Sequence, residues 1–446
     1  MTPIALALAE RAVPRYTSYP TAPQFGPAVD GRVYEAWLAA LPADATISLY
    51  VHVPYCAELC LYCGCHTKAV RRDAPLSAYA QRLAQEISLL AARIGRRKVS
   101  HLHWGGGTPS VLGEARLVAL AALLREAFAF AAIAEHAIEI DPRQATRATI
   151  DALGAMGINR VSLGVQDFSA HVQQAIGRVQ PYRVVADVVD ALRAAGIIDI
   201  NFDLMYGLPR QREDDVRRTV ALAAELRPRR LALFAYAHVP WFRAQQRLID
   251  EADLPGVAER LRQGAAAREL LTARGYAAIG LDHFAAPHDS LALAARDGRL
   301  HRNFQGYTID DADALIGIGA SAIGRLPQGF VQNAPGVGAY ERAIAAGRFA
   351  TLKGLALTGE DRLRGHVIER IMCDLAVDLA ACGAGNGPID FGEGIAALTP
   401  LRDEGLVEIN GARIRVTERG RPFVRLVAAA FDRYLANGTS RHSRAV

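Results

Sequence analysis

The sequence predicts an α/β protein: a partial TIM-like (β/α)6 barrel, with an N-terminal arm before it and a small, mostly helical C-terminal domain with a hairpin after it. Two observations lead to this fold class. Short apolar runs alternate six times with segments of helical period, which is typical of parallel strands joined by right-handed crossover helices. Polar, cysteine-rich or glycine-rich residues follow the runs, at the strand ends where such barrels carry their active sites.

The expected domains are an arm or lid over residues 1–40, a barrel with its extension over residues 41–345, and a C-terminal domain over residues 346–446. Prolines break Pro14–Thr21, and its aromatic residues have no helical period. The arm is therefore expected to be extended and able to cover the barrel mouth. A short helix is expected around Val33–Leu41.

The expected barrel strands are Ile47–Val53, His101–Gly105, Ala137–Asp141, Arg160–Val165, Ile198–Met205 and Leu231–Ala237. The expected helices are Ser77–Ile94, Glu114–Phe130, Thr146–Ala155, Tyr182–Ala195, Asp214–Leu226 and Val257–Ala273. The C-terminal domain is expected to contain helices at Gly359–Ala381 and Pro422–Leu435. Between them, Asn410-Gly411 separates two apolar runs and predicts a hairpin. The last residues, Thr439 to Val446, are expected to be disordered.

Charge and hydropathy argue against several classes of protein. The chain has 446 residues, and its net charge of +5 is modest for that length, so no nucleic-acid partner is expected. The longest apolar stretch, Val118–Ala134, contains Arg125 and Glu126 and is expected to be a buried helix rather than a membrane span. The apolar stretch Ile4–Ala9 lacks the basic flank of a signal peptide. We therefore expect a cytoplasmic protein with no membrane partner.

Four of the six cysteines follow the first expected strand, and three of them, Cys56, Cys60 and Cys63, have the spacing Cys-x3-Cys-x2-Cys. Three thiolates at this spacing can hold a [4Fe–4S] cluster and leave one iron open to a small molecule. A structural zinc site would need Cys65 or His66 as a fourth ligand, and a thiol redox pair would need only two cysteines. The barrel position favours the cluster. Cys65 is either near the substrate or a buried spacer.

Other polar and glycine residues at the strand ends are weaker candidates. Gly105–Pro109, which includes Gly106, Gly107 and Thr108, allows close approach of a ligand to the backbone. Glu139 and Asp203 lie within apolar strands, where a carboxylate is costly unless it is paired or bound to something. They either form a salt bridge inside the barrel or recognise a ribose hydroxyl or an ammonium group. Gln166 and Arg178 are uninformative individually.

Several motifs together resemble the radical S-adenosylmethionine (SAM) superfamily and, within it, the oxygen-independent coproporphyrinogen III oxidases. They are Arg15-Tyr16-Thr17-Ser18-Tyr19-Pro20, the cysteine spacing with Cys63-Gly64-Cys65, His103-Trp104-Gly105-Gly106-Gly107-Thr108-Pro109, Gly164-Val165-Gln166-Asp167-Phe168, Tyr206-Gly207-Leu208-Pro209 and His301-Arg302-Asn303-Phe304-Gln305-Gly306-Tyr307. The resemblance covers nearly the whole chain.

The resemblance implies a [4Fe–4S] cluster and two SAM molecules. Carried over by motif, Cys56, Cys60 and Cys63 hold the cluster, and Tyr50 joins them as a catalytic residue. Residues expected at the first SAM, which chelates the open iron, are Tyr50, Gly106, Glu139 and Ile323. Residues expected at the second SAM are Tyr62, Gly107, Thr108, Gln166, Arg178, Asp203 and Ala237.

The reaction implied by the resemblance is oxidative decarboxylation of the ring A and B propionates of coproporphyrinogen III to vinyl groups, which gives protoporphyrinogen IX. The implied partners are a flavodoxin- or ferredoxin-like electron donor and an unidentified electron acceptor, and a monomer is expected. Arg15, Arg143 and Arg302 are candidates for binding the substrate carboxylates. The alternative is a haem chaperone of the same superfamily, which lacks the N-terminal arm and the fourth cysteine. A zinc-bearing structural or binding protein is the non-enzyme alternative.

Overall fold

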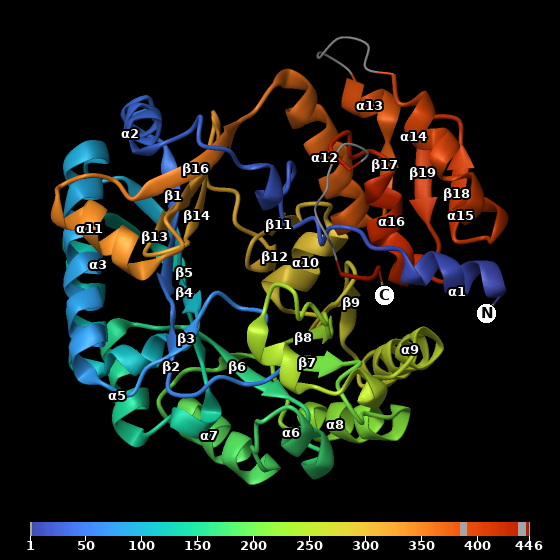
Figure 1. The fold of residues 1–446 in the computed structure, drawn as a ribbon, viewed down its shortest axis with the longest axis horizontal. Coiled ribbons are helices and arrows are strands. Elements are labelled where there is room, and N and C mark those ends of the chain that lie inside the picture. The colour runs from blue at the N-terminus through green and yellow to red at the C-terminus, as the bar shows by residue number, and fades with distance from the viewer. Residues whose placement is uncertain (1, 384–389, 436–442, 446) are drawn as a thin grey trace.

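The computed structural model describes residues 2–383, 390–435 and 443–445, and its framework is a twelve-stranded sheet (Figure 1). The strand order is β16-β15-β14-β13-β1-β4-β5-β6-β7-β8-β10-β9. The six strands of the expected repeat lie next to one another and run parallel: β1 (Thr46–Val53), β4 (Lys98–Gly106), β5 (Ala129–Ile140), β6 (Arg160–Gln166), β7 (Asp199–Tyr206) and β8 (Arg230–Ala235). These bounds confirm the predicted alternation of strands and helices.

Helices pack against the outer face of the parallel strands (Figure 1). They are α3 (Asp73–Ile94), α4 (Glu114–Ala127), α5 (Arg147–Met156), α6 (Ala170–Ala175), α7 (Tyr182–Ala194), α8 (Glu213–Glu225) and α9 (Val257–Ala273). Between sheet and helices lies the main core, which includes the fully buried Trp104, Phe128 and Phe202. Close packing of this layer fixes the positions of the strand ends, where the polar residues are.

One helix prediction is wrong at its C-terminal end. The apolar stretch Val118–Ala134 is not a single helix, because α4 ends at Ala127 and β5 begins at Ala129. Phe128, between them, has extended backbone and a fully buried side chain. Phe130 pairs with Val99 of β4 in a parallel ladder. Pairing with the neighbouring strand therefore outweighs the high helix propensity of the alanines here.

The barrel is open rather than closed, which confirms the predicted partial barrel. On one side β13 (Ala314–Ile318) adds to β1 in parallel, followed by antiparallel β14 (Ile323–Leu326), β15 (Gly329–Asn333) and β16 (Thr351–Ala356). On the other side β10 (His283–Ala285) extends the sheet antiparallel to β8, and β9 (Ala277–Ile279) pairs antiparallel with β10.

Smaller elements complete the barrel region. They are the helices α2 (Gly31–Ala39), α10 (Ser290–Arg296) and α11 (Val337–Ala345), the strand pair β2 (Tyr55–Cys56) and β3 (Lys68–Ala69), and the strand pair β11 (His301–Asn303) and β12 (Gly306–Thr308).

The C-terminal part has its own core and a three-stranded sheet. Its elements are α12 (Gly359–Asp374), β17 (Ala376–Asp378), α13 (Leu379–Gly383), α14 (Gly392–Ala397), α15 (Thr399–Asp403), β18 (Val407–Asn410), β19 (Arg413–Val416) and α16 (Val424–Ala429). The predicted hairpin is confirmed, with Gly411 at positive φ in its turn. The predicted helix Gly359–Ala381 is wrong, because Leu375 adopts left-handed backbone and β17 follows. The predicted final helix is shorter than expected.

The N-terminal arm is not wholly extended, because it begins with a helix, α1 (Pro3–Glu10), that the sequence analysis did not predict. Its apolar face packs into the C-terminal core. The following extended stretch is bridged to the other end of the chain, since Ala12 pairs with Arg444. Of the tail predicted to be disordered, residues 439–442 and 446 lie outside the described residues, and residues 443–445 pack against the arm. In the described parts of the chain, no helix has the length and apolarity needed to cross a bilayer.

Candidate active site at the carboxyl ends of the barrel strands

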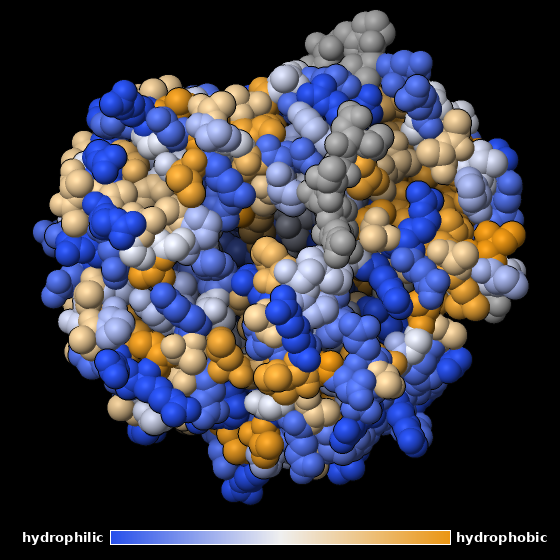
Figure 2. All heavy atoms as spheres, viewed as in Figure 1, coloured by the Kyte–Doolittle hydropathy of each residue, from blue (hydrophilic) through white to orange (hydrophobic). Residues whose placement is uncertain are grey.

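A cavity of about 790 Å³ lies at the carboxyl ends of the parallel strands, and we refer to it as the cysteine cavity. The predicted site residues that line it are Tyr50, Cys56, Cys60, Tyr62, Cys63, Gly106, Gly107, Thr108, Glu139, Gln166, Arg178, Asp203 and Ala237. Ile323 is on β14 and is not among the lining residues. The space-filling view shows a hollow near the centre of this face of the molecule (Figure 2).

The cysteine loop follows β1 and places three sulfur atoms at the cavity, each beside a different polar group. Cys56 Sγ lies 3.3 Å from the Thr67 hydroxyl and 3.6 Å from the Thr108 hydroxyl. Cys63 Sγ accepts a hydrogen bond from the Cys65 amide at 3.4 Å. Cys60 is buried and lies beside two arginines. Hydroxyl, amide and guanidinium donors all stabilise sulfur in its anionic form.

The acidity of the thiols differs around the cavity. Burial raises the pKa of Cys56, although the two hydroxyls oppose that shift. The pKa of Cys63 is lowered to about 7, chiefly by a hydrogen bond from the Cys65 side chain, with a smaller contribution from the Cys65 amide. The contact between the two side chains raises the pKa of Cys65. Cys65 is therefore a donor to Cys63 through both its side chain and its amide.

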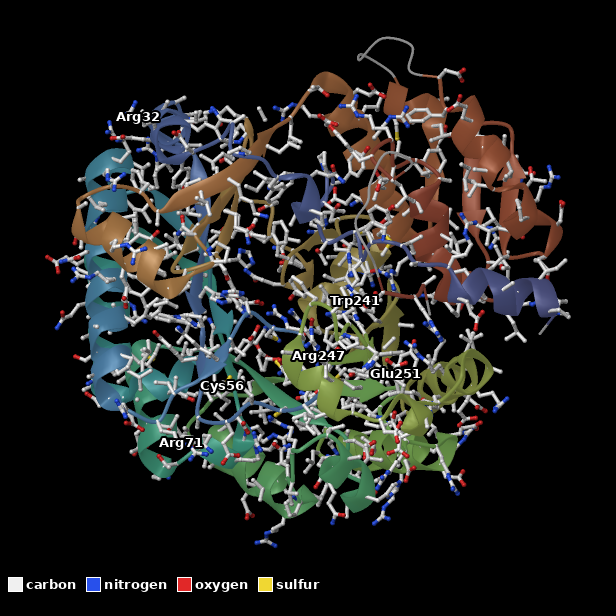
Figure 3. The ribbon with its side chains drawn as sticks, viewed as in Figure 1. Arg32, Cys56, Arg71, Trp241, Arg247 and Glu251 are labelled. Carbon is white, nitrogen blue, oxygen red and sulfur yellow. The ribbon has the colours of Figure 1, made fainter. Side chains whose placement is uncertain are left out.

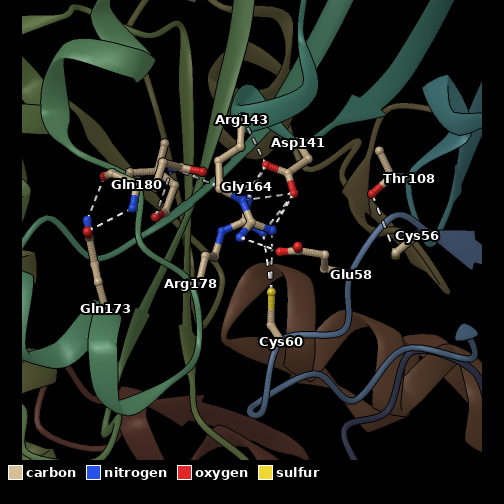
Figure 4. A network of polar contacts seen from close by, with 11 residues as sticks. Cys56, Glu58, Cys60, Thr108, Asp141, Arg143, Gly164, Gln173, Arg178 and Gln180 are labelled. Carbon is tan, nitrogen blue, oxygen red and sulfur yellow. Dashed lines mark hydrogen bonds and ion pairs between the residues drawn. The ribbon is translucent and has the colours of Figure 1, made fainter. Parts of the chain in front are cut away.

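Cys60 is surrounded by an ionic network centred on Asp141 (Figure 4). Arg178 binds both carboxylate oxygens of Asp141, at 3.1 and 3.2 Å, and its Nη1 lies 3.5 Å from Cys60 Sγ. Arg143 also binds Asp141, at 2.7 Å, and its Nη2 lies 3.8 Å from the same sulfur. Burial alone would raise the pKa of Asp141, but the two guanidinium groups hold it below its usual range. One carboxylate thus fixes two cations beside one cysteine sulfur.

Gly106 and Glu139 form a second polar cluster. Gly106 has a φ of 111°, and the ring of His52 leaves no room for a side chain there. Its amide donates to Glu139 at 3.2 Å, and His103 donates to the same carboxylate at 3.0 Å. These hydrogen bonds outweigh burial and lower the pKa of Glu139, so the carboxylate is ionised. The hydroxyl of Tyr50 lies 3.0 Å from His52 Nδ1 at the same place.

Asp203 has no cationic partner among the described residues and accepts hydrogen bonds from Ser162 and Asn201 at 3.0 and 2.9 Å. Burial, with a smaller contribution from the nearby charge of Glu139, raises its pKa to about 6. Glu139 is paired with His103, and a separate ionic cluster nearer the amino ends of the strands pairs Glu135 with Arg160 and Arg230. Asp203 and Glu139 both line the cysteine cavity.

The segment after β8 closes one side of the cavity. Gln246 donates to the carbonyls of Tyr62 and Ala237, at 2.8 and 3.2 Å, and so ties the cysteine loop to this segment. Arg243 donates to the Gly64 carbonyl at 2.9 Å. The part of this segment that carries Trp241 and Arg247 lies beside the loop that carries Cys56 (Figure 3).

Comparisons with known proteins agree with this site. The profile of the Radical SAM superfamily matches residues 50–223, and that of the HemN C-terminal domain matches residues 357–423. The chain is 50% identical over 450 residues to the oxygen-independent coproporphyrinogen III oxidase of Bradyrhizobium diazoefficiens, covering 99% of each chain. It is 44% identical to the enzyme of the same name from Paracoccus denitrificans, covering 99% of this chain and 98% of the other. The solved coproporphyrinogen III oxidase (HemN) of Escherichia coli, a radical SAM enzyme, superposes with a TM-score of 0.89 at 38% identity, over 95% of this chain and all of that one.

The chain belongs to the oxygen-independent coproporphyrinogen III oxidase family. This membership confirms the fold class and the family that the motifs indicate. It also implies a [4Fe–4S] cluster and SAM for this radical SAM enzyme.

The residues of this oxidase-family site fit those cofactors. Its three cysteines are free thiols around one cavity, each with a donor beside its sulfur. Among the residues that the structure describes, no three His, Cys, Asp or Glu side chains are close enough together to hold a single metal ion.

Two residues in contact with predicted site residues, His103 and Asp141, were not predicted as site residues. His103 binds Glu139, and Asp141 binds Arg178. His103 could have been predicted from its place on the strand, two residues before Gly105, because residues two apart on a strand lie on the same face. Asp141 directly follows an apolar strand, as the predicted residues do. Its pairing partner lies 37 positions away in the sequence and could not be inferred from spacing.

Proposed function

We propose that this protein converts coproporphyrinogen III to protoporphyrinogen IX by oxidative decarboxylation of two propionates to vinyl groups, using a [4Fe–4S] cluster and two SAM molecules. The observation that carries the proposal is the convergence of Cys56, Cys60 and Cys63 on one cavity in a chain that matches named oxidases over almost their whole length. Each decarboxylation removes one hydrogen atom and one electron from a propionate and releases CO2. When bound, the cluster supplies an electron to SAM, and SAM supplies the hydrogen-abstracting 5′-deoxyadenosyl radical.

In this proposal Cys56, Cys60 and Cys63 bind the cluster, and the donors beside each sulfur stabilise its negative charge. Asp141 has a positioning role in this proposal, because both of its carboxylate oxygens accept hydrogen bonds from Arg143 and Arg178. Charged and hydrogen-bonded groups outside the ligand shell set the reduction potential of such clusters. The network around Asp141 therefore adjusts the charge that Cys60 presents to the cluster.

The first SAM would contact Tyr50, Gly106, Glu139 and Ile323. Glu139 supports this assignment because it is ionised and faces the cavity, where it can accept hydrogen bonds from an ammonium group. Gly106 supports it because this residue lines the cavity and its amide holds the Glu139 carboxylate there. Tyr50 extends the same wall.

The second SAM would contact Tyr62, Gly107, Thr108, Gln166, Arg178, Asp203 and Ala237. Asp203 is suited to a ribose because its carboxylate is held by two neutral donors and has no arginine among its described partners. Arg178 lines the same cavity and carries a positive charge for a carboxylate. These residues lie on separate strand ends, and Gln246 ties two of them, Tyr62 and Ala237, together.

The remaining parts of the proposal concern partners and location. Electrons would come from a flavodoxin- or ferredoxin-like donor and leave through an acceptor of unidentified chemistry, with the protein working as a monomer in the cytoplasm. The free thiols of all six cysteines support a reducing compartment.

The test is an anaerobic assay of purified protein with reconstituted cluster, reductant, SAM and coproporphyrinogen III. We expect CO2 and protoporphyrinogen IX, and both should require SAM. Stable haem binding without CO2 release would favour the haem chaperone instead. Zinc without iron or sulfide after anaerobic purification would overturn the cluster assignment.

A further inference from the structure

A second cavity, of about 560 Å³, lies between the barrel, the N-terminal arm and the C-terminal domain. We refer to it as the arginine chamber, after the six arginines of its wall: Arg15, Arg260, Arg268, Arg302, Arg419 and Arg425. They come from the arm, from α9, from β11, from the turn after β19 and from α16, so that five separate parts of the chain place guanidinium groups around one space. None of the sequence motifs marks this chamber as a unit.

Positive charge inside the chamber is poorly balanced. Three carboxylates line it, but Glu269 and Glu418 are at its rim, with side chains 73% and 76% exposed. Glu418 is moreover paired with Arg421 at 2.7 Å. Asp282 is the one buried carboxylate among the described residues of the wall. Burial lowers the pKa of Arg268 to about 10 and that of Arg425 to about 9, as expected where cations are crowded away from water.

Several guanidinium atoms of the chamber lack partners within the protein. Nε of Arg260, and Nε and Nη1 of Arg302, are buried and make no hydrogen bond to the described residues. The side chain of Arg302 is only 5% exposed, stacks on the ring of Tyr307 and approaches Asp282 no closer than 3.9 Å. Buried donors are normally satisfied in folded proteins. Unpaired donors on buried cations indicate that an anion completes this site.

Arg425 differs from the others because it is already occupied. It donates to the backbone carbonyls of Pro14, Arg444 and Ala445 at 2.9–3.2 Å, and to that of Val13. This side chain therefore holds the arm and the tail against the C-terminal domain, and it adds charge to the chamber without offering free donors. The donors for a ligand come from Arg260 and Arg302, with Arg15 and Arg268 beside them.

The arginine chamber adjoins the cysteine cavity. Arg15, Asp282 and Arg302 line both spaces. The cysteine cavity alone has the volume typical of a site for one drug-sized ligand. It must hold SAM beside the cluster, so a tetrapyrrole with four carboxylates needs further space. The adjoining space is the one whose wall carries unpaired cations.

We propose that the arginine chamber binds the carboxylates of the tetrapyrrole that are not reacting, while the reacting propionate faces the cysteine cavity. This inference rests on the proposed function. It follows from position: the cysteines line the cysteine cavity and not the chamber, and Arg15 and Arg302 lie at the boundary between the two spaces. The chamber therefore selects for a tetrapyrrole that carries carboxylates on the side opposite the reacting propionate. By binding those carboxylates, it determines which propionate faces the cysteine cavity.

The test uses the protein with its cluster reconstituted and compares Arg260→Gln and Arg268→Gln with Arg262→Gln. Arg262 lies on the same helix, has a side chain that is 59% exposed and does not line the chamber. We expect both chamber variants to raise KM for coproporphyrinogen III, and the inhibition constant of protoporphyrinogen IX, roughly tenfold or more. The control should stay within twofold, and Arg268→Lys should recover part of the loss. Iron content and reductant-driven SAM cleavage should be unchanged in all variants.

A neutral probe separates binding from a structural role. The tetramethyl ester of coproporphyrinogen III should inhibit wild type and chamber variants equally, because it has no charge for the arginines to bind. If the substitutions weaken the ester as much as the tetra-acid, the arginines act on structure and the proposal is wrong. If inorganic phosphate raises the melting temperature of wild type only, without competing with substrate, the chamber holds a free anion and the proposal is also wrong.

Failure of the two proposals can be told apart. If wild-type protein releases no CO2 from coproporphyrinogen III, the proposed function fails. If wild type is active and both chamber variants keep KM within twofold of it, only the assignment of the chamber fails.

Discussion

Arginines line both the cysteine cavity and the arginine chamber, but the pair beside Cys60 shares a buried carboxylate at close range and Arg302 of the chamber does not. Beside Cys60, Arg143 and Arg178 share one carboxylate, Asp141, at distances of 2.7–3.2 Å. In the chamber, Arg302 has two nitrogens without partners, and its nearest carboxylate is 3.9 Å away. The charge of Arg143 and Arg178 is thus largely matched within the protein, and one nitrogen, Nε of Arg178, makes no hydrogen bond to the described residues. The charge of Arg302 is matched less closely, which is why the chamber is the place proposed for an anion.

The largest expected effect tests the cysteine cavity directly. Cys60→Ser should abolish turnover, because it removes one of three cluster ligands. The expected result is loss of cluster iron and of the broad visible absorption, with no CO2 above background. Cys382→Ser is the control, since this cysteine lies in α13, away from both cavities. Full turnover by Cys60→Ser would disprove the assignment of this ligand.

The substitution Asp141→Asn should leave the arginines beside Cys60 without a counter-charge, as Arg302 nearly is in the chamber. It leaves Arg143 and Arg178 buried without a counter-charge, and breaking a buried ion pair from one side costs about 3 kcal/mol. Urea unfolding of the protein should show this loss in the free energy of unfolding. The matched control is Asp187→Asn, which breaks the exposed ion pair with Arg183 and should cost no more than about 0.5 kcal/mol. Equal losses in the two variants would contradict the distinction between paired and unpaired arginines.

The two cavities should also differ in their response to pH. Because Asp203 has a pKa raised to about 6, its carboxylate is ionised above that pH and protonated below it. SAM affinity should therefore fall by roughly tenfold per unit as pH drops below 6, if the carboxylate accepts the ribose hydrogen bonds. Calorimetric titrations at several pH values should show this slope in wild type and lose it in Asp203→Asn. The chamber arginines stay charged throughout, since even Arg425 has a pKa of about 9.

The smallest expected effect concerns Arg143. Its Nη2 lies 3.8 Å from Cys60 Sγ, so its charge favours the reduced cluster. Arg143→Gln should make the reduction potential more negative by a few tens of millivolts, measured by a redox titration followed by electron paramagnetic resonance. Arg147→Gln, on the same stretch but with a side chain that is 75% exposed, should leave the potential unchanged. Equal potentials in all three proteins would mean that the contact carries no electrostatic role.

Local patterns allowed much of the fold and of the cysteine cavity to be predicted. Six strands, the crossover helices and the Asn-Gly hairpin are set by periodicity and turn chemistry within short segments. The errors arose where tertiary contacts override local preference. Phe128 ends a helix because the next residues pair with β4, and Leu375 ends another because β17 joins the C-terminal sheet. Neither pairing is visible in a short window of sequence.

The arginine chamber could not be predicted for a related reason. Its residues are spread from position 15 to position 425 and come together only through the docking of the arm and the C-terminal domain on the barrel. Arginine is also abundant throughout the chain, so that no single position stands out. Arg15 and Arg302, together with Arg143, were candidates from the sequence because a substrate with four carboxylates implies arginines at the barrel mouth. Whether they bind the substrate remains a prediction.

The contacts of Arg425 have a consequence for the order in which the protein is made. The cysteine loop is complete at residue 65, whereas the wall of the chamber requires residue 425. At the usual rate of synthesis these points are separated by roughly 20–70 s on the ribosome. The contacts that hold the arm against the C-terminal domain can form only after this interval, and they include the bonds of Arg425 to the carbonyls of Val13 and Pro14 and the packing of α1 into the C-terminal core. The cysteine loop is therefore made well before the wall of the chamber can be assembled.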